Sequence, residues 1–188
     1  MTNIYQKIEA TLKTTTKRPF LIAIDGPCGS GKSTLGASLA KELNASLFHM
    51  DEFFLQPNQR TEDRLSEPGG NVDYERFKEE VLDHIADADG VTFRPFSCSK
   101  WQLTDAVTVP YNDIVLVEGS YSHHPYFKDA YNVKIFLEIS LEEQKKRIIA
   151  RDGEAIWPMF EEKWIPMENR YFETFKISEN SHYIAKFP

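Results

Sequence analysis

A glycine-rich loop carries the clearest chemical signal in the sequence. Residues 26–33 read Gly-Pro-Cys-Gly-Ser-Gly-Lys-Ser, which satisfies the pattern G-x-x-x-x-G-K-[ST]. With this spacing, backbone amides wrap around a phosphate group, the lysine reaches the β and γ phosphates, and the serine hydroxyl binds Mg²⁺. The sequence therefore predicts ATP, or another nucleoside triphosphate, and Mg²⁺ as cofactors. The residues expected to bind the nucleotide are Gly26, Cys28, Gly29, Ser30, Gly31, Lys32, Ser33 and Thr34.

Two carboxylates stand directly after apolar segments that have the composition of strands. Asp51 follows residues 46–50, and Glu118 follows residues 114–117. In open α/β folds the carboxyl ends of the strands carry the chemistry, so both side chains are expected beside the glycine loop. One carboxylate near the metal can hold Mg²⁺, and a second can accept the proton of an attacking hydroxyl. Taken singly, each acid could equally be a solvated strand-end residue or a helix cap.

Two arginines are candidates for stabilising a phosphate in transfer. Arg147 and Arg151 lie four residues apart in a predicted helix, and hence on one helix face. Two guanidinium groups there could reach a transferring phosphate, which makes residues 147–163 a candidate lid. The alternative is an ordinary solvated basic face near the end of a helix, where the helix dipole favours positive charge.

Other candidate residues have strong structural alternatives. Asp73 precedes a predicted helix and can cap it as readily as it can bind a sugar hydroxyl. Phe54 and Phe96 belong to a group of aromatic residues that more often pack in a core than stack on a base.

A parallel sheet is needed to bring these residues together. Short apolar runs bounded by turn residues predict buried strands at residues 20–24, 46–50, 114–117 and 133–139. Helical spacing predicts helices from the glycine loop to Asn44, from Tyr74 to Gly90, and from a capping box at Ser140 to Arg151.

The remaining segments are expected to be peripheral. Residues 56–71 predict a long exposed loop or lid, and residues 91–96 and 106–109 predict a small hairpin. The chain after Glu154 is rich in aromatic residues, with Pro158 and Pro166 as expected helix breakers.

The composition bounds the class of protein. With 188 residues, of which 41% are hydrophobic, the chain is expected to form one domain with an adequate core. A net charge of −7 argues against nucleic acid polymers and anionic membranes as partners. No apolar run approaches the roughly 20 residues of a membrane span, and no signal peptide is visible, so a cytoplasmic location is expected. The expected partner is a small-molecule substrate, and a homo-oligomer is compatible with the sequence.

Several motifs in order resemble the uridine kinase family of P-loop kinases. They are Ile24–Thr34, Met50–Phe54, Asn71–Tyr74, Val117–Gly119 and Arg151–Asp152, and the resemblance covers residues 20–172. It implies Asp51 as the base for a 5′-hydroxyl, Ser33 and Glu118 at Mg²⁺, Asp73 on the ribose diol, and Arg147 and Arg151 in the lid. The acceptor site that it implies consists of Asp51, Phe54, Asp73, Tyr74, Phe96 and Arg151. The chain departs from the family at Gly153–Trp157, where the family's lid carries more basic residues.

The combined expectation is an α/β fold of the P-loop NTPase, nucleoside kinase-like type. It has a mostly parallel five-stranded sheet flanked by helices, a small hairpin and a lid, in a single domain over residues 1–188. The expected activity is ATP-dependent phosphoryl transfer to a small molecule, above all to the 5′-hydroxyl of a pyrimidine ribonucleoside. Lys32, Asp51, Arg147 and Arg151 are the expected catalytic residues. The alternatives are a kinase for a pantothenate- or sugar-type acceptor and a non-catalytic nucleotide-binding regulatory module.

Overall fold

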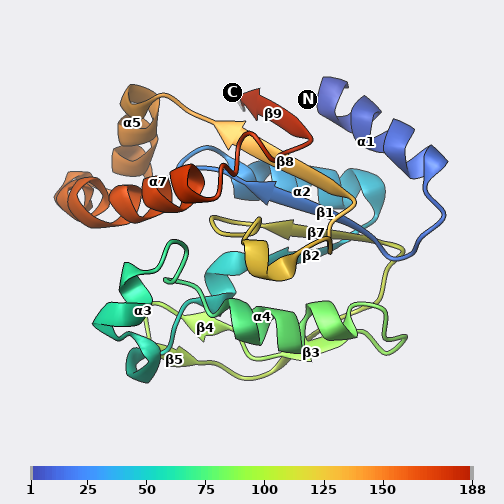
Figure 1. Ribbon diagram of the computed structural model, residues 1–188, viewed down its shortest axis with the longest axis horizontal. Coiled ribbons are helices and arrows are strands. Elements are labelled where there is room, and N and C mark those ends of the chain that lie inside the picture. Colours follow the sequence, from blue (N-terminus) through green and yellow to red (C-terminus); the bar gives the residue numbers. More distant parts are fainter. Residues whose placement is uncertain (1, 187–188) are drawn as a thin grey trace.

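The centre of the molecule is a parallel sheet. The computed structural model describes residues 2–186, and its main sheet has five strands in the order β2-β7-β1-β8-β9 (Figure 1). Every neighbouring pair in this sheet is parallel. The strands are β1 (Phe20–Asp25), β2 (Ser46–His49), β7 (Ile114–Glu118), β8 (Val133–Glu138) and β9 (Tyr183–Lys186). The predicted five-stranded parallel sheet is therefore confirmed.

Strand β1 separates two hydrophobic cores. All six of its residues are buried. Phe20, Ile22 and Ile24 face one core, which also receives Ile8 and Leu35. Leu21 and Ala23 alternate into the other core, which is closed by Phe77 and Tyr171. A strand buried on both faces has no polar side, which is why this segment is an unbroken apolar run in the sequence.

Helices cover both faces of the sheet. Helix α2 (Lys32–Leu43) and helix α1 (Thr2–Thr14) supply residues to the first core, and α5 (Leu141–Asp152) follows β8. The first helix was not expected. Its Ile4, Ile8 and Leu12 recur every four residues and pack with Tyr183 of β9, beside which α1 lies in Figure 1.

A second layer lies below the β2 edge of the sheet in Figure 1. It contains α3 (Glu62–Ser66), α4 (Tyr74–Glu80), and the antiparallel pairs β3 (Val91–Phe93) with β6 (Val107–Val109) and β4 (Phe96–Ser97) with β5 (Gln102–Leu103). The predicted hairpin is thus present, with a second short pair at its tip. The predicted helix from Tyr74 is shorter than expected, because α4 ends at Glu80 and a 3₁₀ turn follows at Leu82–His84.

The C-terminal segment is helical where breakers were expected. Helix α6 (Trp157–Met159), a π-helical turn (Phe160–Trp164) and α7 (Ile165–Thr174) follow one another directly. The expectation that Pro158 and Pro166 break the helix was wrong: each is the second residue of its element, and the element of Pro166 directly follows the π-helical turn. Further 3₁₀ turns span Met50–Phe53, Pro57–Gln59, Pro125–Phe127 and Glu154–Ile156. No helix within residues 2–186 is long and apolar enough to cross a membrane.

Asp25, the last residue of β1, holds the ends of several elements together. Its carboxylate is fully buried and accepts hydrogen bonds from the amides of Gly26 (2.7 Å), His123 (2.9 Å) and Tyr121 (3.2 Å) and from the Tyr171 hydroxyl (2.8 Å). Burial raises the pKa of Asp25 to about 6, although these donors act in the opposite direction. The carboxylate therefore ties α7 to the end of the central strand.

Removing the Tyr171 hydroxyl should destabilise the fold in a pH-dependent way. Tyr171→Phe is expected to lower the free energy of unfolding by about 1.5–3 kcal/mol, because a buried carboxylate loses a donor. The substitution also raises the pKa of Asp25 further. A carboxyl group whose pKa is raised by folding contributes stability below its ordinary pKa, and this contribution is lost as the pH rises through the folded-state pKa. The loss of unfolding free energy in Tyr171→Phe should therefore be larger at pH 8 than at pH 5.

Urea unfolding at both pH values measures this effect. Tyr131→Phe is the matched control, since the Tyr131 hydroxyl is buried and has no hydrogen-bond partner among the described residues. The control should be neutral or slightly stabilising. Equal losses for the two variants would contradict the role given to the Tyr171 bond.

Candidate active site

A cavity of about 1270 Å³ opens at the carboxyl ends of the strands and gathers most of the predicted residues. The predicted site residues that line the cavity are Cys28, Gly29, Gly31, Lys32, Ser33, Thr34, Asp51, Phe54, Phe96, Glu118, Arg147 and Arg151. Gly26 and Ser30 belong to the loop but do not border the cavity, and neither do Asp73 and Tyr74.

The glycine loop joins β1 to α2 as its motif predicts. Gly31 precedes the first helical residue with φ 95°, a left-handed conformation that favours glycine. At Gly26 a Cβ atom would lie 2.4 Å from the backbone oxygen of Leu137, so a side chain is excluded there. These two positions allow the backbone to turn tightly and present the N-terminus of α2 to the cavity. A helix N-terminus with free N–H groups is suited to bind phosphate.

Lys32 is buried against its own loop. Its ammonium group donates hydrogen bonds to the backbone oxygens of Gly26 (2.8 Å) and Pro27 (2.9 Å). This arrangement stabilises the loop and keeps a positive charge at the edge of the cavity. Lys32 is therefore held where its positive charge can stabilise negative charge on a triphosphate bound by the loop.

Ser33 and Glu118 lie close together, as expected for a metal site. The Ser33 hydroxyl donates to Glu118 Oε2 at 3.1 Å, and His49 Nδ1 lies 2.5 Å from Glu118 Oε1. The hydrogen bond to Glu118 is the largest cause that raises the pKa of His49. A hydroxyl and a carboxylate are hard oxygen donors, and Mg²⁺ in phosphoryl-transfer sites needs only a few protein ligands beside the phosphates. The residues thus fit the predicted cofactor.

Neutralising Glu118 should therefore raise the Mg²⁺ requirement. For Glu118→Gln we expect the Mg²⁺ concentration at half-maximal activity to rise roughly tenfold or more, because a charged hard ligand becomes neutral and His49 loses its anionic partner. Titration of Mg²⁺ at saturating ATP measures the change. Glu138→Gln is the control, since Glu138 also ends a strand but is exposed. An unchanged titration would argue against Glu118 as a metal ligand.

Asp51 lies inside the cavity, one residue into the 3₁₀ turn that follows β2. Its side chain is open to the cavity, while the surrounding protein reduces its hydration. This partial desolvation is the main cause that raises the pKa of Asp51; Lys32 lowers it, and Glu118 and Glu168 raise it. A carboxylate with a raised pKa beside a phosphate loop is suited to act as a general base.

The two predicted arginines border the cavity but are paired with acids. Arg147 Nε donates to Glu143 Oε1 at 2.9 Å, and Arg151 Nη2 donates to Asp152 Oδ2 at 2.7 Å. Arg151 is largely exposed. Their place on one helix face is as predicted, and each guanidinium is already held by an acidic side chain of its own helix.

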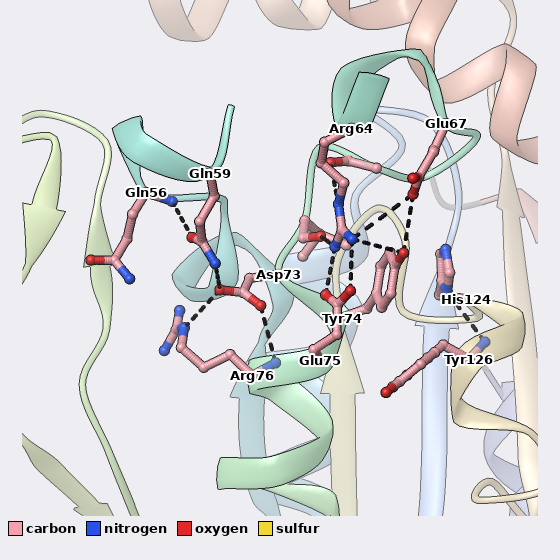
Figure 2. Close-up of polar contacts among 12 residues, drawn as sticks. Gln56, Gln59, Arg64, Glu67, Asp73, Tyr74, Glu75, Arg76, His124 and Tyr126 are labelled. Atoms are coloured by element: carbon pink, nitrogen blue, oxygen red, sulfur yellow. Dashed lines mark hydrogen bonds and ion pairs between the residues drawn. The ribbon is translucent and has the colours of Figure 1, made fainter. Parts of the chain in front are cut away.

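Asp73 and Tyr74 are held in two separate groups of polar contacts, which Figure 2 shows. Asp73 Oδ1 accepts the Arg76 amide (3.1 Å), Asp73 Oδ2 accepts Gln59 Nε2 (2.7 Å), and Arg76 forms an ion pair with the same carboxylate. Tyr74 Oη accepts from Arg64 and its ring stacks on His124. Asp73 is thus the cap of α4, and the structure does not bring it or Tyr74 to the cavity.

Some cavity residues were not anticipated from the sequence. Glu168 of α7 is buried; its Oε2 accepts the Cys28 amide (2.9 Å) and its Oε1 accepts the Ser120 hydroxyl (2.6 Å). The amide of Cys28 in the glycine loop thus donates to a carboxylate oxygen, which shows that this loop amide can bind an anionic group. Arg60 and Trp101 line the cavity on the side of Phe96. No local pattern marks these residues, because each comes from a segment assigned to a loop or left without an element.

Comparison with known proteins gives partial sequence matches. The model of the cytidylate kinase family matches residues 22–89. The tRNA dimethylallyltransferase of Helicobacter pylori (strain ATCC 700392 / 26695) is 33% identical over 104 residues, which are 55% of this chain and 32% of that protein. The chain thus spans about a third of the length of this relative.

Solved structures match over nearly the whole chain. A possible uridine kinase from Bacillus stearothermophilus has a TM-score of 0.71 at 17% identity and covers 98% of this chain and 100% of its own. A protein ascribed to a fructose transport system kinase in Silicibacter sp. TM1040 has a TM-score of 0.66 at 21% identity, with 99% and 98% covered. The D-glycerate 3-kinase of Cryptococcus neoformans has a TM-score of 0.60 at 14% identity, with 93% and 85% covered. The chain therefore shares the α/β fold of these three proteins.

Proposed function

We propose that this protein is an ATP-dependent kinase that phosphorylates a hydroxyl group of a small molecule. One observation carries the proposal: a single cavity is lined by Lys32 and Ser33 of the phosphate loop, by Asp51, and by Phe54 and Phe96. Phosphoryl transfer requires a bound triphosphate and a positioned acceptor hydroxyl in one water-excluding space. This cavity has room for both.

The chain's own residues divide the work of the reaction. Asp51 orients the acceptor hydroxyl and accepts its proton as the bond to phosphorus forms. Lys32 stabilises negative charge on the transferring group. Ser33 and Glu118 would hold Mg²⁺, which neutralises charge on the β and γ oxygens when it is bound. Apolar side chains of the C-terminal helical segment, Met159 and Phe160, border the cavity and limit the access of water.

For the acceptor, a ribonucleoside with a pyrimidine base is the candidate that the resemblance favours. The resemblance to uridine kinases and the possible uridine kinase among the structural neighbours support it. The aromatic rings of Phe54, Phe96 and Trp101 suit a planar base. The place of Asp73 as a helix cap gives no support for a ribose ligand at that position. The names of the other neighbours, which refer to a fructose transport system and to D-glycerate, make sugars and hydroxy acids the next acceptors to examine.

An acceptor screen coupled to ADP production tests the proposal. Purified protein with ATP and Mg²⁺ is expected to release ADP steadily only when a hydroxylated acceptor is supplied, with one phosphorylated product formed for each ADP. Uridine, 2′-deoxyuridine, fructose and gluconate cover the neutral and acidic classes. ATP binding without ADP release for any acceptor would favour a regulatory nucleotide-binding module instead.

A further inference from the structure

Arg60 differs from the other arginines that border the cavity. It follows the 3₁₀ turn Pro57–Gln59 and is half-buried. Its Nη2 donates to Asn71 Oδ1 at 3.2 Å, and its guanidinium lies 5.3 Å from the centre of the Trp101 ring. It forms no ion pair with a carboxylate of residues 2–186, whereas Arg147 and Arg151 are paired with acids. A guanidinium has five N–H donors, so most of those on Arg60 are available for a ligand.

The chemistry around Arg60 is that of an anion subsite. Partial burial of an uncompensated positive charge is unfavourable, and it becomes favourable when an anion completes the site. Asn71 is buried and also borders the cavity, and its amide nitrogen donates to no other group among the described residues. The Trp101 ring forms an apolar wall beside the guanidinium. The Arg60 guanidinium and the Asn71 side-chain amide thus lie in contact at the border of the cavity.

This subsite belongs to the acceptor side of the cavity. Arg60 contacts Asn71 and the Trp101 ring, and Phe96 packs edge-on against Trp101, so these cavity residues form one cluster. Asp51 borders the same cavity. The charges of Asp51 and Arg60 both act on the Cys98 thiol. Burial is the largest cause that raises the pKa of Cys98, Asp51 raises it as well, and Arg60 lowers it. A small molecule in this cavity can therefore present one group to Asp51 and another to Arg60.

We infer that the acceptor is an acidic hydroxy compound, whose hydroxyl meets Asp51 and whose carboxylate or phosphate group is bound by Arg60 and the Asn71 amide. The inference rests on the proposed kinase function, and it replaces the pyrimidine ribonucleoside that the resemblance favours with an acidic acceptor, because of the contacts of Arg60. A neutral nucleoside or sugar would leave the guanidinium without an anionic partner. Specificity then comes from the cost of leaving a buried charge unpaired when the wrong acceptor binds.

Kinetics with matched acceptors test this assignment. Gluconate and pantothenate represent hydroxycarboxylates, ribose 5-phosphate and fructose 6-phosphate represent sugar phosphates, and uridine and fructose are neutral. One acidic class should exceed the neutral compounds in kcat/KM by tenfold or more. Arg60→Gln should reduce kcat/KM for that class by roughly 10- to 100-fold, because charge-assisted hydrogen bonds are lost, and should leave the KM for ATP unchanged. The acidic class with the higher kcat/KM shows whether Arg60 binds a carboxylate or a phosphate group of the acceptor.

The control is Arg94→Gln, which removes an exposed arginine of the same hairpin region that does not border the cavity. Its kinetics should match those of the unchanged protein. If uridine or fructose is the best acceptor, and Arg60→Gln does not alter its kcat/KM, the acidic-acceptor inference is overturned while the kinase function stands.

A binding measurement tests the anion subsite separately from the kinase function. Trp101 is exposed and adjacent to Arg60, so its fluorescence should change when gluconate or ribose 5-phosphate binds, and this change should vanish in Arg60→Gln and in Trp101→Phe. If no acceptor is phosphorylated but this Arg60-dependent change is present, the anion subsite stands and the kinase function fails. Absence of both the change and any turnover overturns both.

Discussion

Replacing Lys32 by alanine is expected to reduce kcat by roughly 10²–10³-fold, the loss typical when one preorganised donor to a developing negative charge is removed. Lys32 is held by the backbone oxygens of Gly26 and Pro27 at the edge of the cavity, so its charge is in place before the reaction begins. The substitution also leaves two carbonyl acceptors without this donor, so the melting temperature should fall modestly. Steady-state kinetics and thermal melting of the same preparation separate the two effects.

Lys41→Ala is the matched control for this prediction. Lys41 lies on the same helix, α2, but it is exposed and does not border the cavity. It should retain both activity and stability. A folded Lys32→Ala protein with normal turnover would contradict the kinase function itself.

Asp51→Asn is expected to lower kcat by roughly 10²–10⁴-fold, the contribution of a general base. ATP affinity should stay the same or increase, because a negative charge near the phosphates is removed. The unchanged protein should lose activity as the pH falls through the pKa of Asp51, which lies above its ordinary value of 3.8 because protein atoms limit its hydration. Only the carboxylate form accepts a proton, so this acid limb should be absent from the pH profile of the variant.

Glu52→Gln controls for the change of charge at the same turn, since Glu52 is adjacent in sequence but does not border the cavity. The control should keep its turnover and its acid limb. If Asp51→Asn instead abolished ATP binding and the residual complex turned over normally, Asp51 would be a ligand for the metal and not the base.

Central strands and the phosphate loop could be predicted because their signals are local. The run of apolar residues in β1 and the spacing of the glycine loop each follow from what one segment must bury or bind. The cap at Ser140 is of the same kind, since its hydroxyl accepts the Glu143 amide three residues ahead. Local signals of this kind also placed Glu118 and Ser33 together, because two parallel strand ends and the loop meet at one edge of the sheet.

Features that depend on distant partners could not be predicted. Strand β9 is half-exposed, and within residues 2–186 its only neighbour in the sheet is β8, so its sequence shows no continuous apolar run. The assignment of Asp73 depended on Gln59, which lies fourteen residues earlier and donates a hydrogen bond to Asp73 Oδ2. The position of Glu168 at the loop follows from the path of α7, which begins beyond an unanticipated helical segment.

The bond from Glu168 to the Cys28 amide gives the phosphate loop an internal competitor. A small free anion that approaches this amide must displace a carboxylate that is already seated and that is also held by Ser120. Such an exchange of one anion for another yields little net affinity. A triphosphate has many oxygens and can contact Lys32, Ser33 and other loop amides at the same time, so its gain exceeds the cost of the exchange. The loop should therefore select its ligand by the number of contacts made, and inorganic phosphate should be a poor inhibitor.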